Sequence, residues 1–476
     1  MEEITFNRTK IIATVGPACN SKEMLKKLVL AGADVFRLNF SHGEHSGHKK
    51  VIENVREINK ELGTHVALLQ DLQGPKIRLG MMQDGVVIAA GDSLTITTDD
   101  CVGDSKKAST TYIGLPTDVK KNDVILVDDG KIELLVKGVK GNDVITEVVH
   151  GGALKSRKGI NLPSTNVSAA SLTEKDKEDL AFGIANDVDW IALSFVRQSK
   201  DIYDLKKRIE AAGKDIRVVA KIEKPEAVDN IDEIIKATDA IMVARGDLGV
   251  EIAMEDVPIV QKRIVKKCNT AAKPVIIATQ MLESMIENPR PTRAETNDVA
   301  NAVMDGADTV MLSAETAAGD HPELAVKSMV KTIRAVERSQ DSVYFKYSEQ
   351  DKRSPLFHND SLVQTAVRLS SDTSAEAIVG MTQSGYTAWQ LSSLRPKANI
   401  FIFTANPALL TKMNLIWGVR GFFYDVAEST DSTIEHIEGI LKKEGHLKSG
   451  DAFITMASMP IEEKLRTNMM KINLVK

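Results

Sequence analysis

The chain of 476 residues contains few cysteines and no long apolar run. Cys19, Cys101 and Cys268 are an odd number at no metal-ligand spacing, which indicates a reducing, cytoplasmic setting. No apolar stretch approaches the roughly twenty residues that span a bilayer. The first residues, Met1 to Phe6, have neither a basic region nor an apolar segment, so we expect no export and no membrane partner.

A strong excess of one charge is also absent. The formal net charge of -5 argues against a nucleic-acid or membrane-surface binder but allows local basic pockets for small phosphates. No Walker A motif occurs, and the glycine spacing fits no Rossmann fingerprint, which excludes two common kinds of phosphate site. The apolar content of 43% is ordinary for a globular protein, and the length predicts two to four domains.

Eight short apolar runs alternate with helical patterns, which is typical of parallel β/α units. The runs occupy residues 10–15, 35–40, 66–71, 190–195, 217–222, 240–245, 274–279 and 309–314. Eight such strands can close a (β/α)₈ barrel. Ser21 is a candidate N-cap for the first helix, and further helices are expected after Gly47 and from Thr173.

Two other segments differ in character. Residues 73–167 contain short β-type runs, at 86–91, 92–97, 123–128 and 131–136, separated by Asp-Gly, Gly-Asp and Gly-Asn turn signals. From Ser354 the pattern becomes α/β again and predicts an open, mostly parallel sheet. The expected domains are therefore a barrel made of 1–72 and 168–345, an inserted all-β domain at 73–167, and a C-terminal α/β domain at 354–476.

Polar side chains gather where the barrel strands end, which is where the active site of such a barrel lies. They are Arg37, Asn39 and Ser41 in the second strand, Asp71 and then Arg78 after the third, Lys221 and Glu223 in the fifth, Arg245 to Asp247 in the sixth, Thr279 in the seventh, and Ser313 and Glu315 in the eighth. Each could instead serve structure: Lys221 with Glu223 as an ion pair, Arg245 with Asp247 as a loop salt bridge, Asn39 as a turn cap. Their gathering at so many strand ends favours catalysis.

The residue types indicate the chemistry. Glu223 and Asp247 suit an octahedral Mg²⁺ that keeps positions open for substrate oxygens. Arg37, Arg78 and Lys221 favour an anionic, phosphorylated substrate, and Lys221 could neutralise a phosphoryl group during transfer. Gly246 and Gly249 allow backbone N–H groups to approach a ligand closely.

At these residues the sequence resembles the pyruvate kinases. The similarity runs from Thr9 to about Ser339, and less closely to the end, through motifs at 10–17, 36–43, 221–223, 242–249, 278–285, 288–295 and 299–308. The resemblance implies a TIM barrel with a small inserted β-barrel lid and a C-terminal regulatory α/β domain. It also implies a homotetramer that uses Mg²⁺, or Mn²⁺ in its place. The reaction would be phosphoryl transfer from phosphoenolpyruvate to ADP, giving pyruvate and ATP in the last step of glycolysis.

The resemblance also assigns roles by position. Glu223 and Asp247 would hold Mg²⁺, Lys221 would stabilise the phosphoryl group, and Arg37 would bind the phosphate. The substrate carboxylate would be bound by Gly246, Asp247 and Thr279. The nucleotide phosphates would be bound by Arg78, Lys158 and the loop from Asn39 to His42. A water chain near Thr279, Ser313 and Glu315 would protonate the enolate. The proton donor itself is not identified.

The chain departs from the family pattern at the monovalent-cation position, which corresponds to Asn39, Ser41, Asp71 and Leu72. Members that need K⁺ read Asp-Thr-Lys-Gly-Pro-Glu-Ile-Arg, whereas this chain has Asp-Leu-Gln-Gly-Pro-Lys-Ile-Arg at 71–78. This set is similar to the K⁺-independent branch. The Lys76 ammonium can supply the charge of the missing ion, so we predict activity without K⁺; the alternative is a solvated hinge lysine.

A second departure concerns regulation. Thr382 to Thr387 resembles the family's effector-phosphate loop, with Thr382, Ser384, Gly385 and Thr387 as candidate contacts, although a simple helix-capping turn is the alternative. The family's glycine-rich loop near the C-terminus is replaced by residues 457–466, which contain two acids. The expected effector is therefore another sugar phosphate, a nucleotide, or none, rather than fructose 1,6-bisphosphate.

Two other functions remain open at this point. An aldolase or lyase that uses a Mg²⁺-bound enolate would keep Glu223 and Asp247 but would not need Arg78, Lys158 or a lid. A regulatory homologue without catalysis would be expected to lose Lys221 or Asp247, and both are present.

Overall fold

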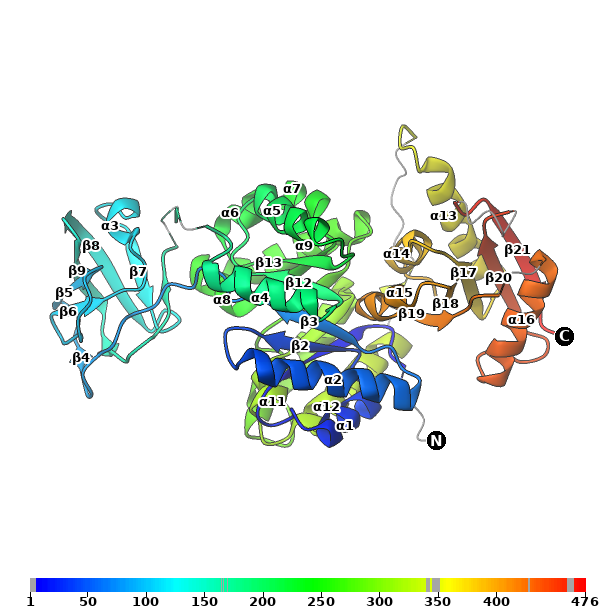
Figure 1. The fold of residues 1–476 in the computed structure, drawn as a ribbon, viewed down its shortest axis with the longest axis horizontal. Helices are drawn as coiled ribbons and strands as arrows, with labels where there is room; N and C mark the ends of the chain where they lie inside the picture. The colour runs from blue at the N-terminus through cyan, green and yellow to red at the C-terminus, as the bar shows by residue number, and fades with distance from the viewer. Residues whose placement is uncertain are drawn as a thin grey trace.

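The computed structural model describes residues 6–163, 165, 167–168, 170–339, 343–344, 352–426, 429–459 and 466–476. Its parts follow one another along the long axis of the molecule: a small β domain, a central barrel and a C-terminal α/β domain (Figure 1). The β domain and the C-terminal domain lie on opposite sides of the barrel (Figure 1). Among the described residues, no helix is long and apolar enough to cross a membrane.

Eight of the described strands close a parallel barrel in the order β1-β16-β15-β14-β13-β12-β3-β2. Their bounds are β1 Lys10–Val15, β2 Val35–Asn39, β3 Ala67–Asp71, β12 Trp190–Leu193, β13 Arg217–Ile222, β14 Ala240–Ala244, β15 Val275–Ala278 and β16 Thr309–Leu312. Each coincides with a run predicted from the sequence, so the barrel is confirmed. The strands are buried on both faces, which is why they read as continuous apolar runs rather than as alternating ones.

The helices of this domain surround the barrel (Figure 1). They are α1 Lys22–Ala31, α2 His45–Leu62, α4 Glu174–Ala185, α5 Ser199–Ala211, α6 Pro225–Asp229, α7 Ile231–Ala237, α8 Arg245–Glu251, α9 Val257–Thr270, α10 Arg293–Asp305, α11 Ala314–Ala317 and α12 Pro322–Ser339, with 3₁₀ turns η1 Met254–Asp256 and η2 Glu283–Ile286. Ser21 caps α1 by accepting from the Met24 N–H, as predicted. Thr173 caps α4 in a capping box. Helix α2 begins at His45, before the predicted start after Gly47, and Glu44 at its N-cap makes no side-chain cap bond.

The interior of the barrel is filled by side chains from its strands and by one residue of the C-terminal domain. Trp190, Met242 and Met311 are among the strand residues of this cluster, and Leu415 from the 3₁₀ turn η4 (Met413–Leu415) joins them fully buried. The backbone carbonyl of Leu415 accepts from the Thr309 hydroxyl at 2.8 Å. The amino end of the barrel is thus packed by the C-terminal domain, and its carboxyl end remains for function.

The inserted domain is a twisted β structure with its own core. Six of its described strands form one sheet in the order β11-β7-β8-β9-β5-β6, and β4 pairs with β10. Their bounds are β4 Val87–Ile88, β5 Ser93–Thr97, β6 Lys107–Ser109, β7 Val124–Val127, β8 Ile132–Lys140, β9 Asp143–His150, β10 Gly152–Ala153 and β11 Ile160–Asn161, with helix α3 at Leu115–Asp118. Isolated bridges join Arg78 to Gly159 and Leu79 to Thr110. One short segment therefore connects both edges of the six-stranded sheet, so that the sheet almost closes on itself.

The C-terminal domain is an open sheet with helices, as the sequence predicts. Its described strands follow the order β19-β18-β17-β20-β21, all parallel except β21, which pairs antiparallel with β20. The elements are β17 Ala377–Met381, β18 Asn399–Thr404, β19 Val419–Phe423, β20 Ala452–Ala457, β21 Met469–Leu474, α13 Phe357–Asp372, α14 Tyr386–Ser393, α15 Pro407–Lys412 and α16 Thr430–Lys443. Strands β6, β9, β10 and β11 in the insert and β21 here were not predicted.

Candidate functional site

Lys221, at the end of β13, lies among several polar side chains at the barrel mouth. Its ammonium lies 2.8 Å from Glu223 Oε1 and 3.3 Å from Asp71 Oδ1. It also donates to the Ser194 hydroxyl at 2.7 Å. Both carboxylates are almost completely buried, with side-chain exposures of 1%. The ion pair considered from the sequence therefore exists, inside a larger network.

The electrostatics of this network follow from burial and from the neighbouring charges. Burial lowers the pKa of Lys221, but Asp71 and Glu223 oppose it more strongly, so the pKa lies above its usual value. Burial raises the pKa of Asp71, and the cations Lys221 and Arg37 reverse this and bring it below its usual value. The pKa of Glu223 is raised, chiefly by burial and then by the nearby charge of Asp247, despite the opposing Lys221.

Arg37 occupies the next position around the mouth, on β2. Its Nε donates to Asp71 Oδ2 at 2.7 Å, and its Nη2 lies 2.6 Å from the same oxygen. Its Nη1 donates to the Thr14 hydroxyl at 3.1 Å. The guanidinium is thus fixed from two strands while its side chain stays 11% exposed, which leaves it accessible to an anion.

Glu223 and Asp247 are suited to a divalent metal together with substrate oxygens. The described residues contain no group of three or more histidine, cysteine or acidic side chains that could hold an ion alone. The two carboxylates are close enough for Asp247 to disfavour the charged form of Glu223, and a cation between them would relieve this repulsion. Two carboxylates with positions left open is the arrangement that Mg²⁺ uses with phosphorylated substrates.

Lys76 approaches the same place from the inserted domain. Its ammonium lies 3.8 Å from Asp247 Oδ1, and both side chains are about one third exposed, at 33% and 32%. The ammonium of a partly exposed lysine therefore lies near one of the two carboxylates. The alternative of a hinge lysine surrounded only by solvent does not describe this contact.

Gly246 and Thr279 bring β14 and β15 together. The Gly246 N–H donates to Thr279 Oγ1 at 2.7 Å, and a Cβ at Gly246 would lie 3.3 Å from that oxygen. Thr279 has a φ of 68°, a conformation that is uncommon for a β-branched residue and often occurs at functional sites. Arg245 pairs with Asp298 at 2.7 Å and not with Asp247, so the loop salt bridge considered from the sequence is wrong.

Ser313 and Glu315 lie at the end of β16. Glu315 accepts from the Ser313 N–H at 2.6 Å and from the Leu282 N–H at 3.1 Å, one bond on each carboxylate oxygen. Burial raises its pKa. The Ser313 hydroxyl is buried and has no hydrogen-bond partner within the described part of the chain.

The loop after β2 forms a tight turn. Asn39 Oδ1 accepts from the Ser41 N–H at 3.1 Å, and the Asn39 carbonyl accepts from the His42 N–H at 3.2 Å. The turn-cap role considered for Asn39 is therefore real, and it leaves His42 exposed. Leu72 is buried, and its N–H donates to the Ala192 carbonyl.

Arg78 and Lys158 lie in the inserted domain, away from Lys221. Arg78 Nη1 donates to the Arg157 carbonyl at 3.1 Å, and the Lys158 ammonium lies 2.7 Å from Asp128 Oδ1. Both contacts are within the inserted domain, which extends outward from the barrel (Figure 1). Neither side chain contacts the barrel-mouth network among the described contacts.

Sequence reasoning missed two hydroxyl groups of the network. Thr14 is on β1 and Ser194 directly follows β12, the first and fourth barrel strands. The Ser194 hydroxyl also donates to the Leu72 carbonyl at 2.8 Å, and this bond holds the hydroxyl where it accepts from Lys221. The strand-end pattern that identified the charged residues would have found both, had hydroxyl side chains been counted.

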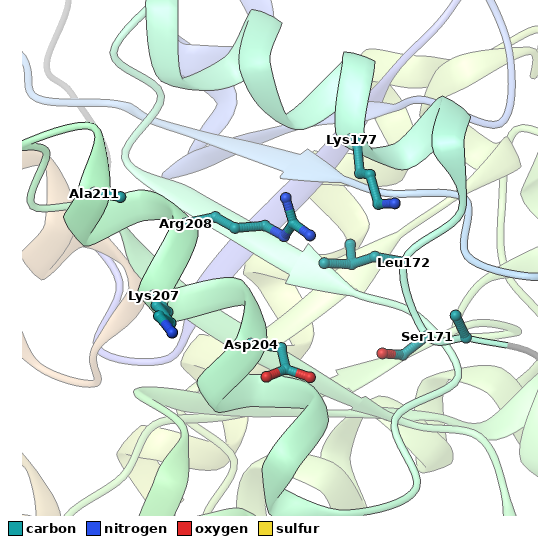
Figure 2. A pocket seen from close by; sticks show the side chains of 8 residues that line it. Ser171, Leu172, Lys177, Asp204, Lys207, Arg208 and Ala211 are labelled. Carbon is teal, nitrogen blue, oxygen red and sulfur yellow. The ribbon is translucent and has the colours of Figure 1, made fainter.

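Two cavities help to delimit the site. A narrow one of about 30 Å³ lies between the inserted domain and the barrel, lined by Lys76, Asn161, Lys224, Asp247, Glu251 and neighbours. A wider one of about 550 Å³ lies between α4 and α5, where Lys177, Lys207 and Arg208 surround it (Figure 2). The second contains none of the strand-end residues, whereas the first contains Asp247.

The candidate effector residues form the turn before α14. The Gly385 N–H donates to the Thr382 hydroxyl at 3.0 Å, and the Tyr386 N–H donates to Ser384 Oγ at 3.4 Å. Thr387 is buried, with its hydroxyl 2.9 Å from that of Thr467. These bonds fit a capping turn; they do not test phosphate binding. Of the acidic segment, residues 460–465 lie outside the described residues.

Known proteins share this whole architecture. The family model "Pyruvate kinase, barrel domain" matches residues 6–326, and "Pyruvate kinase, alpha/beta domain" matches residues 360–473. The pyruvate kinase of Mycobacterium intracellulare is 45% identical over 98% of each chain, and that of Corynebacterium glutamicum is 44% identical over 98% of each. A crystal structure of a pyruvate kinase from Cryptosporidium parvum has a TM-score of 0.90 at 36% identity and covers 99% of this chain and 96% of its own. The chain therefore belongs to the pyruvate kinase family of phosphotransferases, whose glycolytic reaction transfers the phosphoryl group of phosphoenolpyruvate to ADP.

Proposed function

We propose that this family's reaction takes place at the network of Lys221, Arg37, Glu223 and Asp247, with Mg²⁺, or Mn²⁺ in its place, bound by the two carboxylates Glu223 and Asp247. One observation carries the assignment. The Lys221 ammonium is buried at the barrel mouth, 2.8 Å from one of the proposed metal ligands. A cation fixed there stands where a phosphoryl group would pass from one substrate to the other.

In the forward direction the bond between phosphorus and the enol oxygen of phosphoenolpyruvate breaks. An oxygen of the ADP β-phosphate forms the new bond to phosphorus. Lys221 and Arg37 stabilise the negative charge on the phosphoryl oxygens, since both are fixed by Asp71 before substrate arrives. When bound, Mg²⁺ would neutralise charge and orient the substrate oxygens.

The enolate that remains must be protonated at carbon to give pyruvate. We assign the substrate carboxylate to Gly246, Asp247 and Thr279, and the proton route to water near Thr279, Ser313 and Glu315. The unpartnered Ser313 hydroxyl supports this route, because it can bond to such a water. Glu315 already accepts a backbone N–H on each oxygen, so we assign it the orientation of Ser313 rather than the proton transfer.

The inserted domain acts as the lid in this proposal. Arg78 and Lys158 bind the nucleotide phosphates together with the loop from Asn39 to His42, and the lid closes over the mouth to exclude water. In this structure the inserted domain extends outward from the barrel, which fits a lid that is not closed (Figure 1).

Lys76 takes the place of the monovalent cation in this proposal. The support is its ammonium, which lies 3.8 Å from Asp247 Oδ1. Activity would then not need K⁺. We also propose a homotetramer in the cytoplasm, and a sugar phosphate or a nucleotide as the candidate effector at Thr382, Ser384, Gly385 and Thr387.

A coupled assay tests the proposal. Pyruvate formed from phosphoenolpyruvate is measured through lactate dehydrogenase, with and without ADP and Mg²⁺. We expect pyruvate only when both are present. Pyruvate formation that ignores ADP would favour a lyase or aldolase at the same carboxylates and would contradict the transfer.

A further inference from the structure

One side chain connects the lid with both proposed metal ligands. Glu251 is the last residue of α8, the helix that carries Asp247 in its first turn. Its Oε1 accepts from the Lys224 ammonium at 2.8 Å, and Lys224 directly follows Glu223. The same oxygen accepts from Asn161 Nδ2, also at 2.8 Å, and Asn161 belongs to lid strand β11.

The burial of this junction sets it apart from the surface ion pairs of the chain. The side chains of Lys224 and Glu251 are 10% and 1% exposed. By contrast, Lys236 and Glu233 on α7 form a pair of similar length, 2.9 Å, at 70% and 65% exposure. A buried pair tolerates the loss of one partner poorly, whereas an exposed pair contributes little.

The two carboxylate oxygens of Glu251 are used unequally. Glu251 Oε2 is buried without a hydrogen-bond partner among the described residues, while Oε1 takes both donors. A carboxylate can accept about four hydrogen bonds, so one side of this group is unused. A cavity of about 30 Å³, lined by Asn161, Lys224, Asp247 and Glu251 among others, adjoins this junction.

We propose that Glu251 is a positioning residue that couples the lid to Glu223 and Asp247. Through Lys224 it fixes the end of β13, through its own helix it fixes Asp247, and through Asn161 it fixes the base of the lid. Lid position and the geometry of the two carboxylates then change together. The metal part of this inference rests on the proposed function.

Two measurements on the whole protein separate these connections. The lid position is followed by the distance between two spin labels. One is on the native Cys101 in the lid, and the other is on a Tyr203→Cys substitution in α5, at a residue that is 55% exposed. Cys19 and Cys268 are buried and are not expected to react. Metal binding is measured without substrates by titration with Mn²⁺. Electron paramagnetic resonance gives the concentration of the free ion.

The variants are Asn161→Ala, Lys224→Met, Glu251→Leu and the conservative Glu251→Gln, with Lys236→Met as the matched control. We expect Asn161→Ala to broaden the label distance and leave the Mn²⁺ Kd within twofold of wild type. Lys224→Met should leave the label distance unchanged and raise the Mn²⁺ Kd threefold or more. Glu251→Leu should broaden the label distance and raise the Mn²⁺ Kd. Glu251→Gln, which keeps an acceptor for Asn161, should have the wild-type label distance but a raised Kd.

If Glu251→Leu and Glu251→Gln matched Lys236→Met in both measurements, the coupling would be refuted. An effect of Glu251→Leu on unfolding temperature alone, with distance and Kd unchanged, would likewise refute it and leave only a structural role. A wild-type protein that forms no pyruvate would overturn the proposed function, while the label distance would still decide the role of Glu251 in the lid.

Discussion

Lys221 and Glu223 form a buried ion pair, 2.8 Å from ammonium to carboxylate, at the carboxyl end of a barrel strand. The Lys221 ammonium also forms an ion pair with Asp71 at 3.3 Å, and Asp71 in turn forms an ion pair with Arg37. Two cations and two carboxylates therefore alternate around the mouth. In this arrangement each carboxylate orients a cation for the substrate.

Asp71→Asn removes the carboxylate that both cations share. Because Asp71 is buried with two cationic partners, we expect a loss of about 3–5 kcal/mol in the free energy of unfolding at pH 7. The pKa of Asp71 is lower in the folded protein than in the unfolded one. Its stabilisation is therefore present above the unfolded value near 3.9 and is lost as the pH falls through the folded value.

Denaturant unfolding of wild type and Asp71→Asn between pH 7 and pH 2 measures this difference. The two curves should converge as the pH falls below about 4. A difference that stays constant to the lowest pH would show that Asp71 does not act through its charge.

Lys76→Glu restores the acid found in the K⁺-requiring members and places it beside Asp247. Two like charges near the phosphoryl position repel unless a cation separates them. We expect wild type to be active in tetramethylammonium salts and the variant to need KCl. Coupled assays in the two salts check this, and a wild-type rate that nearly disappears without K⁺ would contradict the role of Lys76.

Arg78→Met and Lys158→Met remove the two lid cations assigned to the nucleotide. We expect each to raise the KM for ADP about tenfold and to leave the KM for phosphoenolpyruvate unchanged, since a hydrogen bond to a charged group contributes about 1.5–3 kcal/mol. Initial rates with one substrate varied at a time separate the two constants. Equal increases in both would place these residues outside the nucleotide site.

Leu415→Ala tests whether the C-terminal domain completes the barrel core. Leu415 is fully buried in the barrel interior, so the cavity should lower the free energy of unfolding by about 2–5 kcal/mol. Leu474→Ala, at a residue that is 71% exposed, is the control and should change it little. Thermal denaturation of both variants decides, and equal stabilities would mean that Leu415 does not support the barrel.

The barrel could be predicted from the sequence because its strands are buried on both faces. The eight runs are therefore mostly apolar, and six of them end in the polar residues predicted for the mouth. Strand β21 was missed for the opposite reason: it is an antiparallel edge strand whose residues are half-buried or exposed, so no apolar run marks it. Similarity to a known family added the roles of individual residues, which the pattern alone did not distinguish.

The connections across the site could not be predicted in the same way. Asn161 and Glu251 are separated by 90 residues and by a domain boundary, and Lys224 and Glu251 by 27 residues. Nothing in the local sequence of Glu251 shows that it is buried, because glutamate at a helix end is usually exposed. Such contacts depend on how the lid meets the barrel, which is a property of the folded chain.

The most direct measurement is the rate of ADP-dependent pyruvate formation by Lys221→Met, compared with wild type and with Lys236→Met. Because Lys221 is the buried cation assigned to the phosphoryl group, kcat should fall by about 10³-fold or more. The Lys236→Met control should keep its rate. If a folded Lys221→Met protein retained the full wild-type kcat, phosphoryl transfer at this network would be contradicted.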